Sequence, residues 1–240
     1  LNGVLSAGNT QGFHARPNVG LNLNYRPGKL NVFGNASLNK GAQSVEQSIL
    51  RYSDGKALDQ DNPMVERFGS TSVKAGADYF ANDRHTFGVL VLGNFYNNNA
   101  WKDNLTIFRN ENSAVADSAQ RSKITALSGN SRLNYNLNYR FADTSGLELT
   151  VDADYLTFDG DGNNLLENRL GLPGAPDVLQ TVTRSDIAVW SMKTDLSKNF
   201  KNGFKLEAGA KWNKTDSEND IESMRRTDAE WQLDPRRTNL

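Results

Sequence analysis

Polar and apolar residues alternate in short runs along the chain. In residues 18–25, valine, leucine and tyrosine occupy every second position, with asparagine and glycine between them. A period of two predicts a β-strand with one apolar and one polar face. The next four residues, 26–29, read Arg-Pro-Gly-Lys and predict a short turn. Residues 30–39 then alternate again, so the whole stretch predicts a β-hairpin.

The same hairpin unit recurs three times, with short turns near positions 82, 144 and 202. A further strand is expected over residues 1–8, and another begins near Trp231. The sequence therefore predicts nine strands and a truncated tenth. Two stretches, 43–51 and 220–231, have some helix-forming composition and are expected to form at most a turn or two of helix.

Within each hairpin the connection is short, and between hairpins we expect long polar loops. These expected loops are residues 40–70, 98–123, 159–184 and 214–229. Short turns on one side, long loops on the other and strands of about 9–13 residues are typical of bacterial outer-membrane barrels. We therefore expect an all-β fold, an antiparallel up-and-down transmembrane β-barrel segment of about 9–10 strands.

Composition favours a membrane barrel over a soluble sandwich, which would also alternate. Hydrophobic residues are 37% of the chain, below the roughly 45–50% of globular domains. The mean hydropathy is −0.63. Asparagine is uncommon in most β-strands, but it occurs 29 times here, which suits strands with one face in contact with water. No apolar run is long enough for a membrane helix.

Two sets of residues follow from the alternation. The polar positions are expected to face a hydrated lumen that accepts polar solutes: Asn22, Asn24, Asn134, Asn136, Asp152, Asp154, Lys193, Lys205 and Lys211. The aromatic residues near strand ends are expected to form girdles at the two membrane interfaces: Tyr25, Tyr79, Tyr139, Tyr155 and Trp212.

Charge and cysteine content exclude several functions. The net charge of −1 argues against nucleic-acid binding, which needs a basic surface. The absence of cysteine excludes thiolate zinc sites and cysteine nucleophiles. His14 lies in the loop between the first two predicted strands and His85 beside a predicted short turn, so the two histidines form no nucleophile–base set. We expect no enzyme, no cofactor and no catalytic residue.

Two further motifs give weak indications of a binding site. Asp159, Asp161 and Asn163 resemble the start of a calcium loop, but Asn164 and Leu170 stand where such a loop needs Gly and Glu. A Gly/Asp-rich connection is the simpler interpretation. Two arginine pairs, at 225–226 and 236–237, could contact anionic lipopolysaccharide or a ligand, or be solvated loop charge.

Three segments carry a family resemblance. The run GLNLNYRPGKLNVFGNASLN at 20–39 resembles a barrel hairpin of TonB-dependent receptor-like outer-membrane proteins, most of all those of the Bacteroidetes. The segments RLNYNLNYRF at 132–141 and DADYLTFDGDGNN at 152–164 are similar in style. The resemblance implies a parent barrel of about 22 strands closed by a plug domain. Residues 1–240 would be a single barrel segment of that parent, without the plug.

The leading hypothesis is thus a segment of an outer-membrane receptor that takes up a nutrient such as a metal chelate, glycan or peptide. The resemblance implies contact with outer-membrane lipid, with TonB through the plug, and with an unknown nutrient ligand. It also implies a bacterial outer-membrane location. The alternatives are a non-transporting structural or adhesive barrel, and a soluble all-β binding protein.

Overall fold

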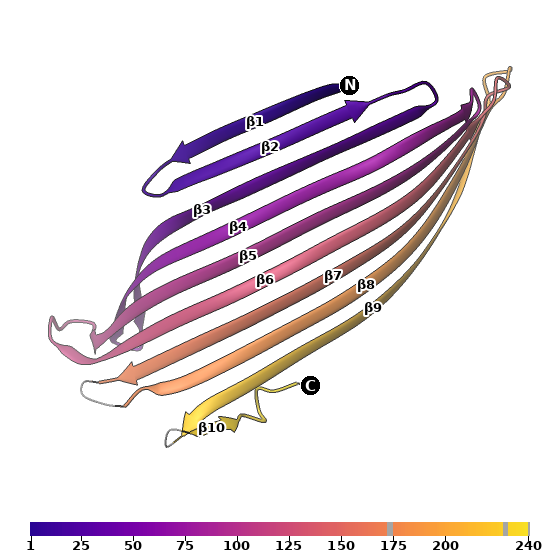
Figure 1. Ribbon diagram of the computed structural model, residues 1–240. Helices are drawn as coiled ribbons and strands as arrows, with labels where there is room; N and C mark the ends of the chain where they lie inside the picture. Colours follow the sequence, from indigo (N-terminus) through magenta and orange to yellow (C-terminus); the bar gives the residue numbers. More distant parts are fainter. Residues whose placement is uncertain (172–174, 228–229, 240) are drawn as a thin grey trace.

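The computed structural model describes residues 1–171, 175–227 and 230–239. These residues form one antiparallel sheet of ten strands in chain order (Figure 1). The strands are β1 (Asn2–Gln11), β2 (Ala15–Tyr25), β3 (Leu30–Ser53), β4 (Lys56–Asn82), β5 (His85–Asn110), β6 (Ala116–Ala142), β7 (Leu147–Leu170), β8 (Asp177–Asn199), β9 (Lys205–Thr227) and β10 (Glu230–Leu233). The described residues contain no helix able to cross a membrane.

The four predicted hairpin turns are confirmed. They join β2 to β3, β4 to β5, β6 to β7 and β8 to β9 at one end of the sheet, here called the short-turn end. Gly28, Gly146 and Gly203 take positive φ angles of 58°, 83° and 84° in three of them, a conformation that glycine adopts without a Cβ clash. In the β6–β7 turn, Asp143 accepts hydrogen bonds from the Ser145 hydroxyl and from backbone N–H groups, which hold the pKa of its carboxyl below the usual value.

The expected long loops are wrong, and so are the two expected helical turns. Strands β3 to β9 are 23 to 27 residues long. The expected loop at 40–70 is the far half of β3 and β4, joined by the two residues Asp54 and Gly55. Residues 43–51 lie within β3, 220–227 within β9 and 230–231 within β10, whereas residues 172–174 and 228–229 of the expected loops and helical stretch lie outside the described residues.

The misassigned segments carry apolar residues at irregular positions on both faces, such as Val45 and Leu50 on β3, which is why a period of two did not reveal them. A strand needs an apolar face only where that face meets lipid or a core, and its backbone ladder forms regardless of side-chain polarity. The ladder of β3 and β4 runs without a break from the pair Leu30 and Tyr79 to the pair Ser53 and Lys56. Each of these strands is therefore longer than the apolar stretch that it contains.

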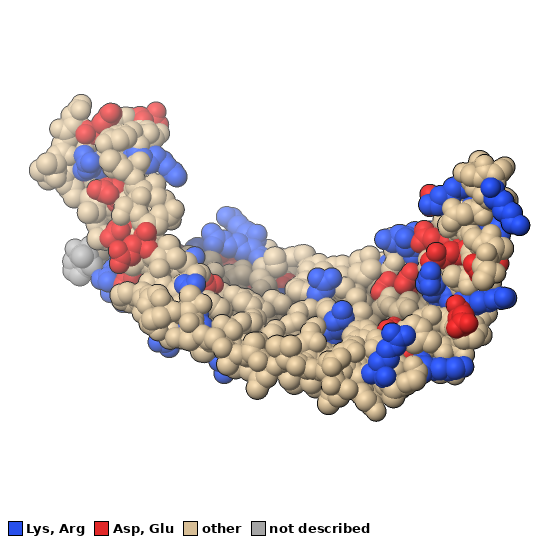
Figure 2. Space-filling view, turned by 90° about the horizontal axis from the view of Figure 1, so that it is seen from above, with Lys and Arg blue, Asp and Glu red and all other residues tan. Residues whose placement is uncertain are grey.

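The register aligns the apolar positions of neighbouring strands into a continuous apolar band on one face. Val32, Ala77, Val89, Leu137, Ala153 and Met192 are successive cross-strand partners within it. The band comprises alternate positions in residues 19–25, 30–38, 73–79, 87–95, 133–141, 147–157, 190–196 and 206–212. Four of these eight stretches have the ~9–11 residues that a tilted strand needs to cross a bilayer, and the other four have seven. Figure 2 shows charged side chains gathered toward the two ends of the curved sheet and mainly uncharged atoms between.

The sheet is a single curved layer without an enclosed core. Among the described residues, only Ala57, Ala100, Val178 and Leu179 are buried hydrophobics. Large side chains of the apolar band stay exposed, such as Leu137 at 62%. The sheet is open, because β1 and β10 each pair with one neighbour only in the described chain. The apolar band therefore depends on a non-aqueous surrounding for burial.

Candidate functional site on the polar face

The nine residues predicted to face a lumen all project from one face of the sheet, opposite the apolar band. We call it the polar face. The register shows this directly: Asn136 is paired with Asp154, and Asp152 is followed across the sheet by Lys193 and Lys211. Asn22, Asn24, Asn134 and Lys205 hold equivalent alternate positions. Because the sheet is open, a lumen in front of this face stays a prediction.

Asparagine side chains on the polar face form short hydrogen-bonded chains that end on a carboxylate. Asn24 Nδ2 donates to Asn31 Oδ1 over 3.0 Å, and Asn31 Nδ2 donates to Asp78 Oδ2 over 3.1 Å. A second chain runs from Asn138 to Asn136 (3.0 Å) and on to Asp154 (2.9 Å). An amide can donate and accept at once, so it relays a hydrogen bond between strands. These amides therefore bind one another as well as the water in front of them.

Two of the lysines on this face are paired within their own strands. Lys193 Nζ lies 2.6 Å from Asp195 Oδ2, and Lys205 Nζ lies 2.5 Å from Glu207 Oε1. All four side chains are about half exposed or more, and such pairs add little stability. Their effect is local neutralisation of these two lysine charges.

A second polar cluster lies further from the short turns and was missed by sequence reasoning. Glu66 on β4 accepts hydrogen bonds from Gln43 on β3 and from Asn98 on β5, the latter over 2.7 Å. All three residues fall in segments that were expected to be loops. The available signal was the dipeptide Asp54-Gly55, a strong hairpin turn that would have placed residues 40–70 on two paired strands.

Three asparagines near this cluster keep a buried acceptor without a partner in the described chain. They are the Oδ1 atoms of Asn62, Asn98 and Asn104, on β4 and β5. All three belong to the polar face, opposite Gln47, Ser128 and Ser122 respectively. A buried acceptor left without a donor costs about 1–3 kcal/mol. Each of these atoms is enclosed by the described chain and remains an unsatisfied acceptor on the polar face.

The predicted girdle residues lie on the apolar face, and the structure adds neighbours to them. Tyr79, Phe87 and Tyr139 form one cross-strand row near the short turns, with 5.0 Å between the ring centroids of the last two. Phe87 was not anticipated, because its place beside two tyrosines depends on register. Tyr25 is half exposed near the same end of β2.

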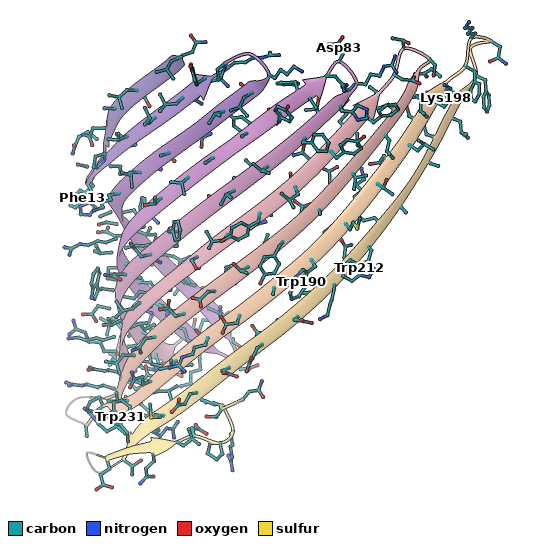
Figure 3. All side chains as sticks on the ribbon, turned by 45° about the vertical axis from the view of Figure 1, so that its right-hand side comes forward. Phe13, Asp83, Trp190, Lys198, Trp212 and Trp231 are labelled. Carbon is teal, nitrogen blue, oxygen red and sulfur yellow. The ribbon has the colours of Figure 1, made fainter. Side chains whose placement is uncertain are left out.

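The second aromatic group lies toward the other edge of the apolar band. Tyr155 is 5.2 Å from Trp190 between ring centroids, and Lys214 Nζ is 5.0 Å from the centroid of the Trp190 ring. Trp212 is opposite Met192 and 57% exposed. Figure 3 shows Trp190 and Trp212 on adjacent strands, away from Asp83 and Lys198 at the short-turn end. Their role as interface girdles stays a prediction.

The calcium-loop hypothesis does not fit the structure. Asp159, Asp161 and Asn163 occupy alternate positions of the extended strand β7, on the same face as the apolar band. Alternate strand residues are about 6.6 Å apart, too far for three side chains to surround one Ca²⁺ ion at 2.3–2.6 Å. The described residues contain no group of three or more His, Asp or Glu that could hold a metal ion.

A fold of membrane-length apolar stretches with a polar opposite face is the pattern of an outer-membrane protein. Residues 140–240 match the outer membrane protein beta-barrel family. The match places the chain in the bacterial outer membrane, and the ten antiparallel up-and-down strands agree with it. The soluble all-β alternative is thereby removed.

Solved outer-membrane receptors resemble the chain only weakly. The ferric yersiniabactin uptake receptor of Yersinia pestis has a TM-score of 0.33 and 10% identity, over 94% of this chain and 44% of the receptor. The ferric preacinetobactin receptor of Acinetobacter baumannii has a TM-score of 0.35 and 9% identity, over 88% and 42%. The chain thus spans less than half the length of these receptors, and TM-scores of this size establish no function. No curated protein matches the chain.

Proposed function

We propose that the chain forms part of the wall of an outer-membrane receptor that imports a nutrient with energy supplied through TonB. The observation that carries this proposal is the extent of the polar face. It continues past the apolar band through the far halves of β3 to β9, where Glu66, Gln43 and Asn98 present hydrogen-bonding groups. A polar wall that begins outside the membrane and continues through it suits capture and passage of a polar solute.

The chain's own residues have a binding role in this proposal, and no chemical step. The cluster around Glu66 contacts the nutrient at the end away from the short turns, which corresponds to the outer side in bacterial barrels. The amide chains that end at Asp78 and Asp154 keep the wall polar at membrane level. A plug domain, which the proposal requires for the TonB contact, would come from sequence beyond these residues.

The proposal is tested by uptake in the native host. A strain lacking this gene is compared with the parent on a panel of ferric chelates, oligosaccharides and peptides as limiting nutrients. We expect slower growth on one class, and the same defect in cells that lack TonB. Equal growth on every class, combined with altered surface adhesion, would instead favour the structural or adhesive barrel.

Two matched variants then assign the defect to the polar face. Glu66→Gln changes the charge of the polar cluster, and Glu46→Gln makes the same change on β3 but on the opposite face, where Glu46 is exposed. We expect reduced uptake for Glu66→Gln and normal uptake for Glu46→Gln. Equal uptake by both variants would contradict a nutrient-binding role for this cluster.

A further inference from the structure

Three arginines lie around a hollow at the end of the sheet opposite the short turns. The hollow has a volume of ≈ 360 Å³ and includes Arg225 of β9 together with Arg236 and Arg237, which follow β10. Gln232 and Asp234 also line it. Three of the four arginines in the two pairs, which the sequence places eleven residues apart, are therefore brought to one site. We call this hollow the arginine pocket.

The chain builds the pocket by a turn that leaves β9 and returns to it. β10 pairs with β9 so that Gln232 is opposite Arg225. Asp234 N–H then donates to Ser223 O over 2.7 Å, and Asn239 pairs again with Ile221. The turn between these points carries Arg236 and Arg237.

Side-chain hydrogen bonds anchor this turn. Ser223 is 2% exposed, and its hydroxyl donates to Arg237 O over 3.2 Å. Its backbone N–H donates to Thr238 Oγ1 over 3.1 Å, and Asp234 Oδ1 accepts from the Arg236 N–H over 3.1 Å. The arginine side chains thus project from a backbone that is held at several points.

The carboxylates near the pocket leave most of the arginine donors free. Arg225 Nε lies 3.4 Å from Asp177 Oδ1, and Arg237 Nε lies 3.8 Å from Asp234 Oδ2. Each is a single long contact, whereas a guanidinium carries five N–H donors and binds an anion best through two parallel bonds. Among the described residues that line the pocket or pair with its arginines, three guanidiniums outnumber two carboxylates.

We propose that the arginine pocket binds the carboxylate or phosphate group of a soluble anionic ligand. Arg225 and Gln232 belong to the polar face, so the pocket opens away from the face that carries the apolar band and meets lipid. This position favours a dissolved solute over a lipid headgroup as the source of the anion. Only the identification of this solute with the imported nutrient rests on the proposed function.

The same face continues from the pocket as a row of polar residues. Asp177 is opposite Asn168, which is opposite Ser122, which in turn is opposite Asn104. Ser122 Oγ donates to Asn168 Oδ1 over 2.5 Å, and the Asn104 Oδ1 has no partner in the described chain. The remainder of the ligand would therefore lie against amides and hydroxyls, which suits a solute rich in hydroxyl or amide groups.

Binding of inorganic phosphate by the detergent-solubilised full chain tests the pocket. Calorimetric titration at low ionic strength avoids screening of the charges. We expect saturable binding that weakens at least tenfold in Arg225→Gln and in Arg236→Gln. Arg51→Gln, on the same face of β3 but six strands away, should bind as the unaltered protein does. Circular dichroism of each variant confirms that the sheet is retained.

Three results would overturn the proposal. The first is no saturable phosphate binding up to about 10 mM, and the second is equal phosphate binding by all variants. The third is that the arginine variants lose binding to lipopolysaccharide vesicles but bind phosphate as the unaltered protein does. The uptake assay separates this inference from the proposed function. If the arginine variants lose phosphate binding but keep normal uptake, the pocket is an anion site but the anion is not the imported nutrient. If the unaltered protein binds phosphate but no TonB-dependent uptake is found, the proposed function is wrong and the anion site still stands.

Discussion

Single residues decide how closely the strands of this sheet pack. At Gly76 on β4, an added Cβ would lie 2.5 Å from Cζ of the Phe33 ring, which covers the glycine from the neighbouring strand. Lys74 Nζ lies 5.6 Å from the centroid of the same ring. The ring shields backbone that a glycine leaves bare, an arrangement known to offset the low strand stability of glycine.

Replacing this glycine should disturb the β3–β4 pairing. Gly76→Val would push the Phe33 ring off its site, and we expect a loss of about 1–3 kcal/mol in the free energy of unfolding. Urea unfolding in detergent micelles measures it. Gly12→Ala is the control, since nothing lies within 4 Å of a Cβ added there. Equal midpoints for the two variants would show that the Phe33 contact does not stabilise the sheet.

The sequence predicted which residues share a face but not which residues touch. Asn22 and Asn136 were assigned to the polar face from a period of two alone, and the register places both there. The partner of Asn136, Asp154, depends on register across a turn. The same holds for Phe87 beside Tyr139. The face on which a residue lies depends only on its position along one strand, whereas its contacts depend on the alignment of two strands.

Each long strand is an element with two parts. Near the short turns one face is apolar, as in residues 87–95 of β5, and further along polar and apolar residues mix on both faces, as in residues 97–108. Alternation predicted the first part because lipid contact imposes it. It could not show the second, where the apolar residues follow no period of two.

A charged substitution should therefore have opposite consequences in the two parts of β5. Val91 lies in the apolar band, and Asn99 lies on the same face beyond it. Val91→Arg should cost about 2–4 kcal/mol of folding free energy in lipid vesicles, and Asn99→Arg only about 0–1 kcal/mol.

Equilibrium unfolding in vesicles compares the two variants directly. Similar costs for both would mean that the band is misplaced along the strand. The two side chains share strand and face, so depth in the bilayer is the variable that separates them.

On the scale of the whole molecule, the sheet lacks the features that stabilise a soluble protein. It has one layer, few buried hydrophobic residues in the described chain, and two edges with a single neighbour. Its long-range pairing is confined to adjacent strands, so each strand depends on the next. Lipid or detergent must replace the missing second layer.

The chain should accordingly need an amphiphile to fold. We expect a strong β signal in far-ultraviolet circular dichroism in detergent or lipid, and aggregation or weak signal in plain buffer. A monodisperse β protein in buffer alone would contradict the membrane assignment of the apolar band.

The hairpin of β3 and β4 extends well past the bilayer. Residues 39–53 of β3 continue beyond the apolar band, about 50 Å of extended chain. The tip at Asp54 and Gly55 is exposed, and Gly55 O accepts a hydrogen bond over 2.9 Å from the Glu111 N–H of the β5–β6 connection. Exposed polar tips tolerate inserted sequence. The tip is therefore a place where an epitope tag could be displayed on living cells, and antibody labelling of unbroken cells would reveal which side of the membrane it occupies.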